Sequence, residues 1–447
     1  LALDQRTNLK MPNKVRDVYD QLPFPTLIVV GGGFAGLELV KRLDGKPYKV
    51  LLIDRNNHHC FQPLLYQVAT ASLGADSIAH PFRRTVGPMP NFAFRMANVI
   101  AVKPELNILV TDRGEFHYDQ LVIATGSTTN FFGNKEIARE AMQLKTVAQA
   151  LDIRSDFLQD FEAALYLDDE HDRRRQLNFV IVGGGPTGVE LAGALAEIRM
   201  TILKKEYREM ESEHMQIHLV DSNTSLLNNF SKKAQEKAFE YLTEMGVSVR
   251  FGMRVIGCDE NTIKFADGST MATNTLIWAA GVKGVCIPGL ESAFNAKADR
   301  FNVDEFSRLN GFGNIYAVGD VALNMTESAW LRGHPQVAPA AIQQAKNLAK
   351  NLLKDPSQWT PFKYNDKGSM ATIGRFKAVM DRGKLHLSGP IAWFSWIFIH
   401  VMSLVSFRNR MLVLFNWAWK FLSWKNTIRL IVRPYVRKAT VTEQEAI

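Results

Sequence analysis

The stretch TLIVVGGGFAGLELV, residues Thr26–Val40, decides the fold because it joins a strand, a turn and a helix without a break. Four of its first five residues are apolar and most are β-branched, which predicts a buried strand. Three glycines then predict a tight turn, and the residues after them predict a helix. The next apolar run, YKVLLID, ends at Asp54 and predicts a second strand. This order is typical of a βαβ unit.

The same pattern returns about 150 residues later in NFVIVGGGPTGVELAG, Asn178–Gly193. An apolar strand, IHLVD, follows it and again ends in an acid, Asp221. Two further strands, in LVIATGS (Leu121–Ser127) and LIWAAGV (Leu276–Val282), end at a small residue and a glycine, where backbone is expected to approach another group closely. Two βαβ units predict either two dinucleotide sites or one long site.

Each glycine of Gly31-x-Gly33-x-x-Gly36 has a separate expected task. The first forms the turn, the second lets the backbone approach a pyrophosphate, and the third lets helix and strand pack closely. The helix N-terminus adds partial positive charge, and Asp54 can accept hydrogen bonds from a ribose diol. The alternative is a purely structural glycine turn. The residues expected to bind the first dinucleotide are Gly31, Gly33, Phe34, Ala35, Gly36, Asp54, Arg55, Ala124, Thr125 and Gly126.

The second motif, Gly183-x-Gly185-x-x-Gly188, also lies between a strand and a helix and is followed by a strand that ends in an acid. It predicts a site for a nicotinamide dinucleotide. Asp221 favours a free ribose 2′-hydroxyl, and the next three residues, Ser222–Thr224, carry no positive charge, so NADH is preferred over NADPH. The residues expected to bind it are Gly183, Gly185, Pro186, Thr187, Gly188, Asp221, Ala280 and Gly281.

Composition indicates a globular chain whose basic character is confined to its C-terminal part. Of the 447 residues, 46% are hydrophobic and 22% charged, as in proteins with a sizeable core. Between Arg408 and Lys438 there are eight Lys or Arg and no Asp or Glu, which equals the whole net charge of +8. The three cysteines are widely spaced, so neither a disulfide framework nor a zinc site is expected, and a reducing compartment fits. The N-terminal region lacks the apolar segment of a secretory signal.

The C-terminal stretch FNWAWKFLSWK, Phe415–Lys425, mixes three tryptophans with two lysines. Upstream, Ile391–Phe407 has no charged residue but is at the lower length limit for a bilayer span. Tryptophan favours the headgroup zone, and lysine and arginine attract anionic lipid. We therefore expect two amphipathic helices lying on an anionic membrane surface. The alternatives are one transmembrane span or a soluble hairpin used for dimerisation or packing, and the high apolar content argues against nucleic acid.

An N-terminal GxGxxG, an ATG, a second GxGxxG and the late stretch NIYAVGDVA (Asn314–Ala322) together resemble the two-dinucleotide-binding-domain flavoproteins. The resemblance implies an α/β fold with two Rossmann-like domains. FAD would lie in the first, with Asp320 on its ribitol, and NADH in the inserted second. The C-terminal region would be an amphipathic helical membrane anchor. The expected parts are 1–145 and 283–386 for FAD, 146–282 for NADH and 387–447 for the anchor.

Five stretches narrow the resemblance to the type II NADH:quinone oxidoreductases, over about residues 26–433. They are Asp54–Leu73, Gly188–Gly193, Val337–Asn351, Tyr364–Val379 and Leu404–Trp419. The resemblance implies a single-subunit, membrane-bound flavoenzyme that oxidises NADH, transfers hydride to FAD and two electrons to a membrane quinone, and pumps no protons. Its place would be peripheral, on the cytoplasmic face of the inner membrane or an equivalent mitochondrial face, with a homodimer possible.

Five site residues are carried over from this family. Glu190 matches the family's glutamate after the second glycine motif and would lie near nicotinamide and flavin; the alternative is a surface residue in a first helical turn. Lys377 would pair with Glu190 or approach the quinone, or else be a solvated lysine. Ala338, Pro339 and Gln343 match the quinone-contacting AQxAxQ motif, with Pro339 in place of its first glutamine. Proline is tolerable there if it lies in the first turn of a helix.

Other readings remain open at this point. Disulfide reductases of this superfamily need a redox CxxC or CxxxxC, which the chain lacks, and Cys60 alone suggests sulfide:quinone oxidoreductase less well than packing. His58 and His59 are adjacent and point apart, so no metal site is expected. A soluble NADH-dependent ferredoxin or rubredoxin reductase is the runner-up, against which the tail argues. A flavoprotein that binds nicotinamide for signalling or assembly is the third reading.

Overall fold

The computed structural model describes residues 22–259, 261–423, 429–431 and 433–436. The expectations about the N-terminal region, Trp424, Lys425 and the last two basic residues, Arg437 and Lys438, lie outside the described residues. The chain divides into two compact units, which are described separately. Unit 1 comprises residues 1–59, 81–127 and 283–366, and unit 2 comprises 60–80, 128–282 and 367–447.

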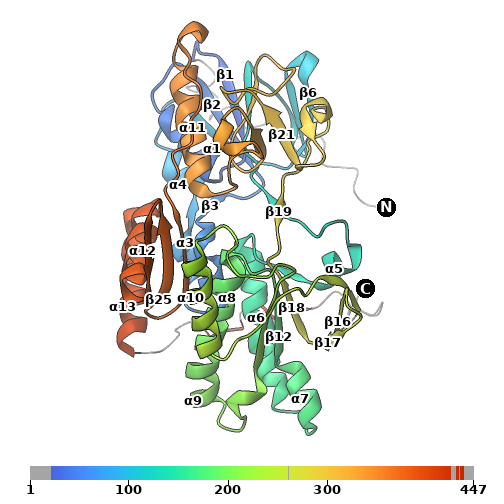
Figure 1. Ribbon diagram of the computed structural model, residues 1–447. Coiled ribbons are helices and arrows are strands. Elements are labelled where there is room, and N and C mark those ends of the chain that lie inside the picture. The colour runs from blue at the N-terminus through green and yellow to red at the C-terminus, as the bar shows by residue number, and fades with distance from the viewer. Residues whose placement is uncertain (1–21, 260, 424–428, 432, 437–447) are drawn as a thin grey trace, which may run out of the picture. The chain divides into compact units, whose positions relative to one another are not determined.

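The central sheet of unit 1 has the strand order β22 (Ile315–Ala317), β9 (Gln120–Ile123), β1 (Thr26–Val30), β2 (Lys49–Asp54), β5 (Phe92–Met96). All of its neighbouring strands run parallel, with Val30 opposite both Ile53 and Ile123. Strand β1 is almost fully buried, as expected for a parallel sheet covered on both faces. Helices α1 and α11 pack side by side on this unit (Figure 1). The first βαβ unit predicted from the sequence is confirmed.

The elements of unit 1 follow the chain in three blocks. They are β1 (Thr26–Val30), α1 (Phe34–Arg42), β2 (Lys49–Asp54); α4 (Phe82–Val86), β5 (Phe92–Met96), β6 (Val99–Lys103), β7 (Ile108–Thr111), β8 (Gly114–His117), β9 (Gln120–Ile123); and β20 (Phe294–Asn295), β21 (Arg300–Val303), β22 (Ile315–Ala317), β23 (Ala322–Asn324), α11 (Ala338–Leu352). The short strands β3 (His58–Cys60), β4 (Ala79–Pro81) and β19 (Val282–Lys283) fall where the chain passes between units.

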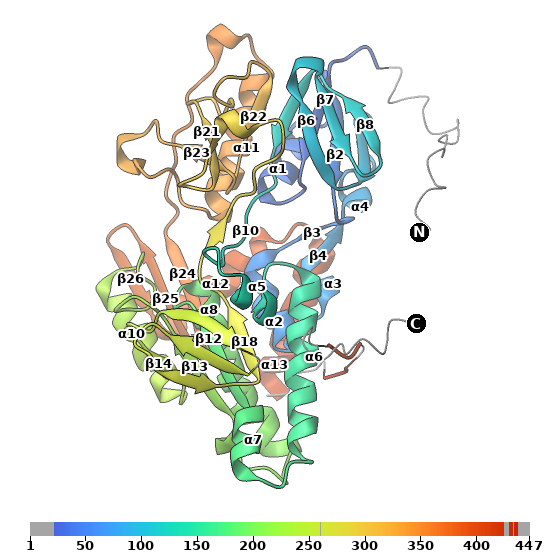
Figure 2. The same ribbon diagram turned by 90° about the vertical axis from the view of Figure 1, so that its right-hand side faces the viewer.

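The central sheet of unit 2 repeats this pattern as β11-β18-β12-β13-β14 (Figure 2). Its strands are also parallel, and Val182 lies opposite both Val220 and Trp278. The second glycine-motif strand therefore occupies the same central position as the first. The duplication seen in the sequence is a duplication of the fold.

Unit 2 contains the remaining elements, listed here in chain order. They are α2 (Leu65–Ala69), α3 (Ala75–Ile78), β10 (Thr128–Thr129), α5 (Lys135–Glu140), β11 (Met142–Gln143), α6 (Val147–Ala164), α7 (Glu170–Gln176), β12 (Asn178–Val182), α8 (Pro186–Ile198), α9 (Lys204–Glu206), β13 (Gln216–Val220), α10 (Lys232–Glu244), β14 (Ser248–Arg250), β15 (Val255–Asp259), β16 (Thr262–Phe265), β17 (Thr270–Ala272), β18 (Thr275–Trp278), β24 (Ser369–Gly374), β25 (Lys377–Arg382), β26 (Leu385–Ser388), α12 (Gly389–Ser403) and α13 (Phe407–Ser423).

The C-terminal part of unit 2 is a three-stranded antiparallel sheet, β24-β25-β26, followed by two helices. Helix α12 packs on β25, and α13 packs on α12 and α3 (Figure 1). The two helices predicted in this region are confirmed as helices. In the part of the chain that the structure describes, neither these nor any other helix has the length and apolar character needed to cross a bilayer.

The observed division of the chain differs from the expected parts in four places. Residues 387–447, expected as a separate part, are assigned to unit 2. Residues 60–80, 128–145 and 367–386 belong to unit 2, whereas all three were expected with the FAD domain. The reason is packing between distant segments: α2 packs on α6 and α8, β11 pairs with β18, and β24 packs on α8. The return to unit 1 at Lys283 agrees with the expected boundary.

Candidate functional sites

The residues expected to bind the first dinucleotide gather at one edge of the unit 1 sheet. Strands β1, β2, β9 and β22 are parallel, so their carboxyl ends share this edge. The glycine motif follows β1, Asp54 and Arg55 stand at the end of β2, residues 124–126 follow β9, and Asp320 follows β22. Ligands of open parallel sheets bind at the carboxyl ends of the strands.

The glycines of this motif have the geometry that a dinucleotide requires. Gly31 has φ +98°, and a Cβ there would lie 2.4 Å from the Ala124 carbonyl oxygen. A Cβ on Gly36 would lie 1.8 Å from the Gly31 carbonyl oxygen, so helix and turn touch through backbone alone. A Cβ on Gly33 would meet no protein atom within 4 Å. The first and third glycines are needed by the fold, and the second faces open space that a phosphate can fill.

Two carboxylates complete the first edge. Asp54 accepts hydrogen bonds from the backbone N–H groups of Gly32 and Asn56, both at 2.7 Å, and so ties the strand end to the glycine turn. Burial raises the pKa of Asp54, and these two amides oppose that rise. Asp320 accepts a hydrogen bond from Ser127 Oγ at 2.7 Å. Asp320 does not cap a helix, because the element that follows it is strand β23.

Unit 2 presents a second edge with the same construction. A Cβ on Gly188 would lie 1.9 Å from the Gly183 carbonyl oxygen, and a Cβ on Gly185 would meet nothing within 4 Å. Asp221 accepts hydrogen bonds from the Gly184 N–H and from the Asn223 N–H. Pro186 and Thr187 are exposed at the start of α8, and residues 280–281 follow β18 beside them in the parallel sheet. The residues predicted for the second site thus lie within one unit.

The two kinds of glycine are separable by mutation. We expect Gly185→Ala to leave the thermal midpoint unchanged, because its backbone is extended and its Cβ has room, but to weaken NADH binding about tenfold or more by occupying space needed for phosphate. Gly188→Ala is expected to cost about 2 kcal/mol of stability because its Cβ overlaps backbone. Thermal melts and NADH titration of both variants check this. Equal loss of stability in both would contradict the assignment of Gly185.

Glu190 lies on α8, just after the second glycine motif, and is buried with 9% of its surface exposed. The surface-residue alternative is therefore wrong. Its Oε1 accepts a long hydrogen bond of 3.4 Å from the Thr372 N–H, and the Trp396 indole also faces it. Burial raises the pKa of Glu190 to about 8, and these two donors only partly offset that effect. At neutral pH its carboxyl group is mostly protonated and can both hold and release a proton.

One interpretation of the sequence predicted an ion pair between Lys377 and Glu190. That prediction is wrong, because Lys377 pairs with Glu244 instead. Its Nζ lies 2.5 Å from Glu244 Oε2 on α10 and 5.3 Å from the centre of the Tyr241 ring. The side chain is 28% exposed, so this ion pair is partly screened by solvent. The pair attaches β25 to α10 and gives Lys377 a structural role in unit 2.

The three residues expected at the quinone lie on helix α11 in unit 1, whereas Glu190 and Lys377 lie in unit 2. Helix α11 begins at Ala338, and Pro339 is in its first turn, as predicted. Gln343 exchanges two hydrogen bonds of 3.0 Å with the backbone of Asn365. The next residue, Gln344, is buried and accepts a bond from the Gly319 N–H at 2.6 Å. Gln344 therefore ties α11 to the backbone beside Asp320.

The cysteine and histidines near residue 60 have structural surroundings. Burial raises the pKa of the Cys60 thiol to about 12, which leaves almost no thiolate at neutral pH. His59 is buried, and its Nδ1 donates to the Gly32 carbonyl oxygen at 3.0 Å. It also packs edge-on against Phe34. His59 thus stabilises the first glycine turn through a hydrogen bond and a ring contact.

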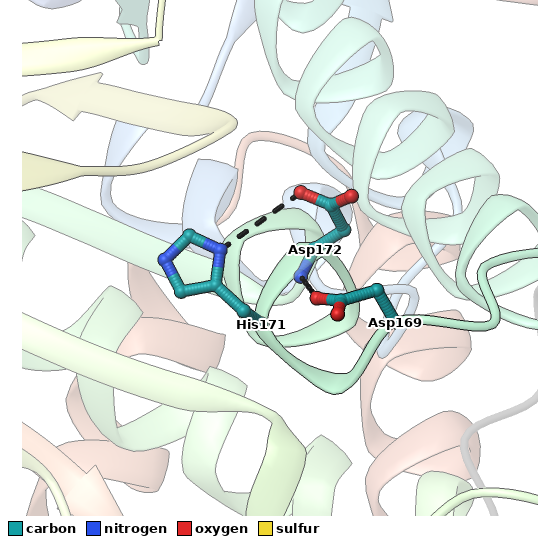
Figure 3. A group of neighbouring side chains, drawn as sticks. All are labelled: Asp169, His171 and Asp172. Atoms are coloured by element: carbon teal, nitrogen blue, oxygen red, sulfur yellow. Dashed lines mark hydrogen bonds and ion pairs between the residues drawn. The ribbon is translucent and has the colours of Figure 1, made fainter.

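One group of acids and histidine in the described residues has spacing compatible with a metal ion: Asp169, His171 and Asp172 (Figure 3). Asp169 is the N-cap of α7, and its carboxylate accepts from the Asp172 N–H at 3.0 Å. The His171 and Asp172 side chains are exposed and 3.9 Å apart. Helix capping explains this arrangement, and we assign no metal to it.

Several residues of these sites were not identified from the sequence. Ser127, which bonds Asp320, follows the ATG stretch directly and was within the quoted pattern. Trp396, whose indole faces Glu190, and the hydrogen-bonded residues Tyr66, Gln67 and Trp417 come from three separate elements of unit 2. No local pattern relates positions so far apart along the chain.

Two family models match successive parts of the chain. Residues 25–345 match the pyridine nucleotide-disulphide oxidoreductase model, and residues 367–430 match the NDH2 C-terminal domain model. The first match contains both glycine motifs and Asp320. The second contains β24 to β26 and both C-terminal helices.

Curated relatives match over nearly the whole chain. The type II NADH:quinone oxidoreductase Ndh of Mycobacterium tuberculosis is 33% identical over 438 residues, covering 94% of this chain and 91% of that protein. The mitochondrial internal alternative NAD(P)H-ubiquinone oxidoreductase A1 of Solanum tuberosum is 31% identical and covers 88% and 86%. The solved structure of NDH2 from Plasmodium falciparum in complex with NADH has a TM-score of 0.84 at 20% identity, covering 92% of this chain and all of that one. At that identity the structural match establishes the fold.

Proposed function

Because this chain belongs to the type II NADH:quinone oxidoreductase family, we propose that it oxidises NADH and reduces a quinone. The observation that carries the proposal is the pair of sheet edges. At each edge the second glycine of the motif has free space around it, and a carboxylate at the end of the next strand accepts a hydrogen bond from the glycine turn. One edge serves the flavin and the other the nicotinamide. The enzyme thus has one site for each dinucleotide.

Unit 1 fits FAD. Gly33 leaves room for the pyrophosphate, Asp54 offers carboxylate oxygens to the adenosine ribose, and Asp320 with Ser127 offers polar atoms for the ribitol chain. When bound, FAD supplies the chemistry that accepts a hydride from NADH and delivers two electrons onward. The chain's contribution is to bind, orient and shield it.

Unit 2 fits NADH. Gly185 leaves room for the pyrophosphate at the start of α8, where backbone N–H groups and the helix dipole favour negative charge. Asp221 would repel a 2′-phosphate, which supports NADH over NADPH. Glu190 stands five residues after Gly185 on the same helix. Reduction of a quinone consumes protons, and a buried carboxyl with a pKa near 8 can hold one in a site closed to water.

The acceptor is a lipid-soluble quinone, and the C-terminal helices support this assignment. Helix α12 exposes Ile391, Phe394, Phe398 and Met402, whose spacing of three and four residues places them on one face. Helix α13 exposes Phe415 and Trp419 in the same way. An apolar face of this kind suits the boundary between headgroups and acyl chains, with Arg408 near anionic lipid. We propose peripheral attachment to the inner membrane, with α11 contributing Ala338, Pro339 and Gln343 to the quinone site.

The proposal is tested by steady-state assay of the flavin-loaded protein on anionic vesicles that contain a membrane quinone. We expect rapid NADH oxidation only when quinone is present, and much slower oxidation of NADPH. Transfer of the electrons to a ferredoxin or rubredoxin with no reaction toward quinone would instead support the soluble-reductase reading. Binding of NADH without turnover toward any acceptor would support a signalling or assembly role.

A further inference from the structure

A turn in unit 2 holds an exposed phenylalanine in a backbone conformation that phenylalanine rarely adopts. The turn runs from Phe131 to Asn134, between β10 and α5, and the Asn134 N–H donates to the Phe131 carbonyl oxygen at 3.0 Å. Its two central residues, Phe132 and Gly133, have φ angles of +51° and +80°. Turns with positive φ at both central positions favour glycine, asparagine and aspartate, because a larger side chain is strained there. Local conformation therefore does not explain the choice of phenylalanine at position 132.

Burial does not explain Phe132 either. Its side chain is exposed, with 68% of the residue surface accessible to solvent. The neighbouring Phe131, in contrast, is partly buried and packs on Trp278, with ring centres 5.8 Å apart. An exposed ring contributes little hydrophobic stabilisation to the fold. Backbone strain that persists without a gain in packing is typical of functional sites.

The turn is attached by hydrogen bonds to the end of strand β18. The Phe132 N–H donates to Asn130 Oδ1 at 2.8 Å, and the Asn130 N–H donates to the Gly281 carbonyl oxygen at 3.2 Å. The Trp278 indole N–H donates to the Asn130 carbonyl oxygen at 2.9 Å. These bonds fix the backbone of Phe132 relative to Trp278 and Gly281. The position of the ring is therefore set before any ligand binds, which lowers the entropy that binding costs.

The Phe132 ring lies against the second sheet edge. A Cβ on Gly281 would lie 3.0 Å from Phe132 Cζ. Gly281 is itself exposed and has a φ of +88°. The backbone just before it touches the glycine motif, since a Cβ on Gly183 would lie 2.7 Å from the Ala279 carbonyl oxygen. Phe132 thus stands beside the backbone that is expected to bind the nicotinamide dinucleotide.

The order of the strands indicates which half of the dinucleotide meets this ring. The neighbouring strands β18, β12 and β13 run parallel, so they end at the same edge. Asp221, expected at the adenosine ribose, follows β13, and Gly185, expected at the pyrophosphate, follows β12. A dinucleotide that passes from Asp221 over Gly185 continues toward the end of β18, where Gly281 and Phe132 lie. The half that reaches this end is the nicotinamide riboside.

We propose that Phe132 is a binding residue for the nicotinamide riboside of NADH, and that the strained turn holds its ring in place for this contact. The phenyl and nicotinamide rings are both flat, so packing one on the other removes surface of each from water. Phe132 thereby lets unit 2 bind the whole dinucleotide more tightly than its ADP-ribose part. This inference deepens the proposed function and rests on its assignment of the second edge to NADH.

The test is calorimetric titration of the full-length, flavin-loaded, oxidised protein with NAD⁺ and with ADP-ribose, which lacks the nicotinamide. Neither ligand can donate a hydride, so binding is measured without turnover. Phe132→Ala is expected to weaken NAD⁺ binding about tenfold and to leave ADP-ribose binding unchanged. Phe132→Tyr, which keeps an aromatic ring, is expected to retain the wild-type affinity for both. Tyr166→Ala removes another exposed aromatic side chain of unit 2 and is the matched control, expected to change neither affinity.

The variant Phe132→Gly separates binding from folding. Glycine adopts positive φ without strain, so the thermal midpoint is expected to stay near the wild-type value, while NAD⁺ affinity falls as in Phe132→Ala. Unchanged NAD⁺ affinity in either variant, an equal loss of affinity for both ligands, or a markedly lower thermal midpoint in Phe132→Gly would overturn the proposal. A wild-type protein that binds neither ligand would contradict the NADH site itself, and with it both the proposed function and this inference.

Discussion

Replacement of Glu190 by glutamine is expected to reduce quinone-dependent turnover about a hundredfold at neutral pH. The wild-type carboxyl is mostly protonated there because burial raises its pKa to about 8, and glutamine keeps its shape but cannot release a proton. In the wild-type protein the rate should therefore change near pH 8, and in Glu190→Gln this change should be absent. The pH profile of kcat in both proteins measures this. A variant with the wild-type rate and pH profile would show that Glu190 takes no part in the reaction.

The same substitution has a predictable effect on stability. The pKa of Glu190 in the folded protein lies above the ordinary value of 4.5, so between about pH 5 and pH 8 the folded state holds a proton that the unfolded chain has lost. Wild-type stability should therefore decrease as pH rises through this window, and Glu190→Gln should remove that part of the decrease. Denaturant midpoints measured across the window provide the comparison. The pKa values of Asp54 and Cys60 are also raised by burial, but these groups are the same in both proteins, so their contributions cancel when the two stabilities are compared.

Substitution of the exposed apolar face is expected to release the protein from membranes. Ile391, Phe398 and Phe415 are 66%, 66% and 67% exposed, so replacing all three by serine removes apolar surface without opening the core. Loss of burial in the bilayer of roughly 4 kcal/mol corresponds to about a thousandfold weaker partitioning. Vesicle sedimentation of the intact protein measures it, and NADH binding should be unchanged because the second sheet edge is untouched.

A matched control distinguishes this face from apolar surface in general. Tyr166, Met200 and Ile256 are exposed apolar residues of the same unit that lie outside the C-terminal helices. Their replacement by serine should leave vesicle binding as it is. If the α12 and α13 variant still binds vesicles with wild-type affinity, the attachment assigned to these helices is wrong.

The parts of the fold that depend on local pattern could be predicted from the sequence. Both glycine motifs, the strands before and after them and the position of Pro339 in a first helical turn follow from residue order within short windows. Parallel pairing then brings residues from several strand ends to one edge. For this reason the amino-acid sequence alone is enough to group the residues that share each sheet edge.

The parts that depend on packing between distant segments could not be predicted. Residues 60–80 belong to unit 2 because α2 packs on α6 and α8. No pattern within these residues predicts that packing. Lys377 pairs with Glu244, a residue more than a hundred positions away, because β25 packs on α10. The burial of Glu190 is similar in origin, since Thr372 and Trp396 from the C-terminal part enclose a helix of the second glycine motif.

The central claim, that electrons from NADH reach a quinone, is tested most directly by stoichiometry. The flavin-loaded protein is mixed anaerobically on vesicles with NADH and excess quinone, and NADH consumed and quinol formed are counted in the same sample. If electrons from NADH reach a quinone, one quinol forms for each NADH, and NADH consumption is not sustained when quinone is omitted. NADH consumption that proceeds equally without quinone, or that yields no quinol, would contradict it.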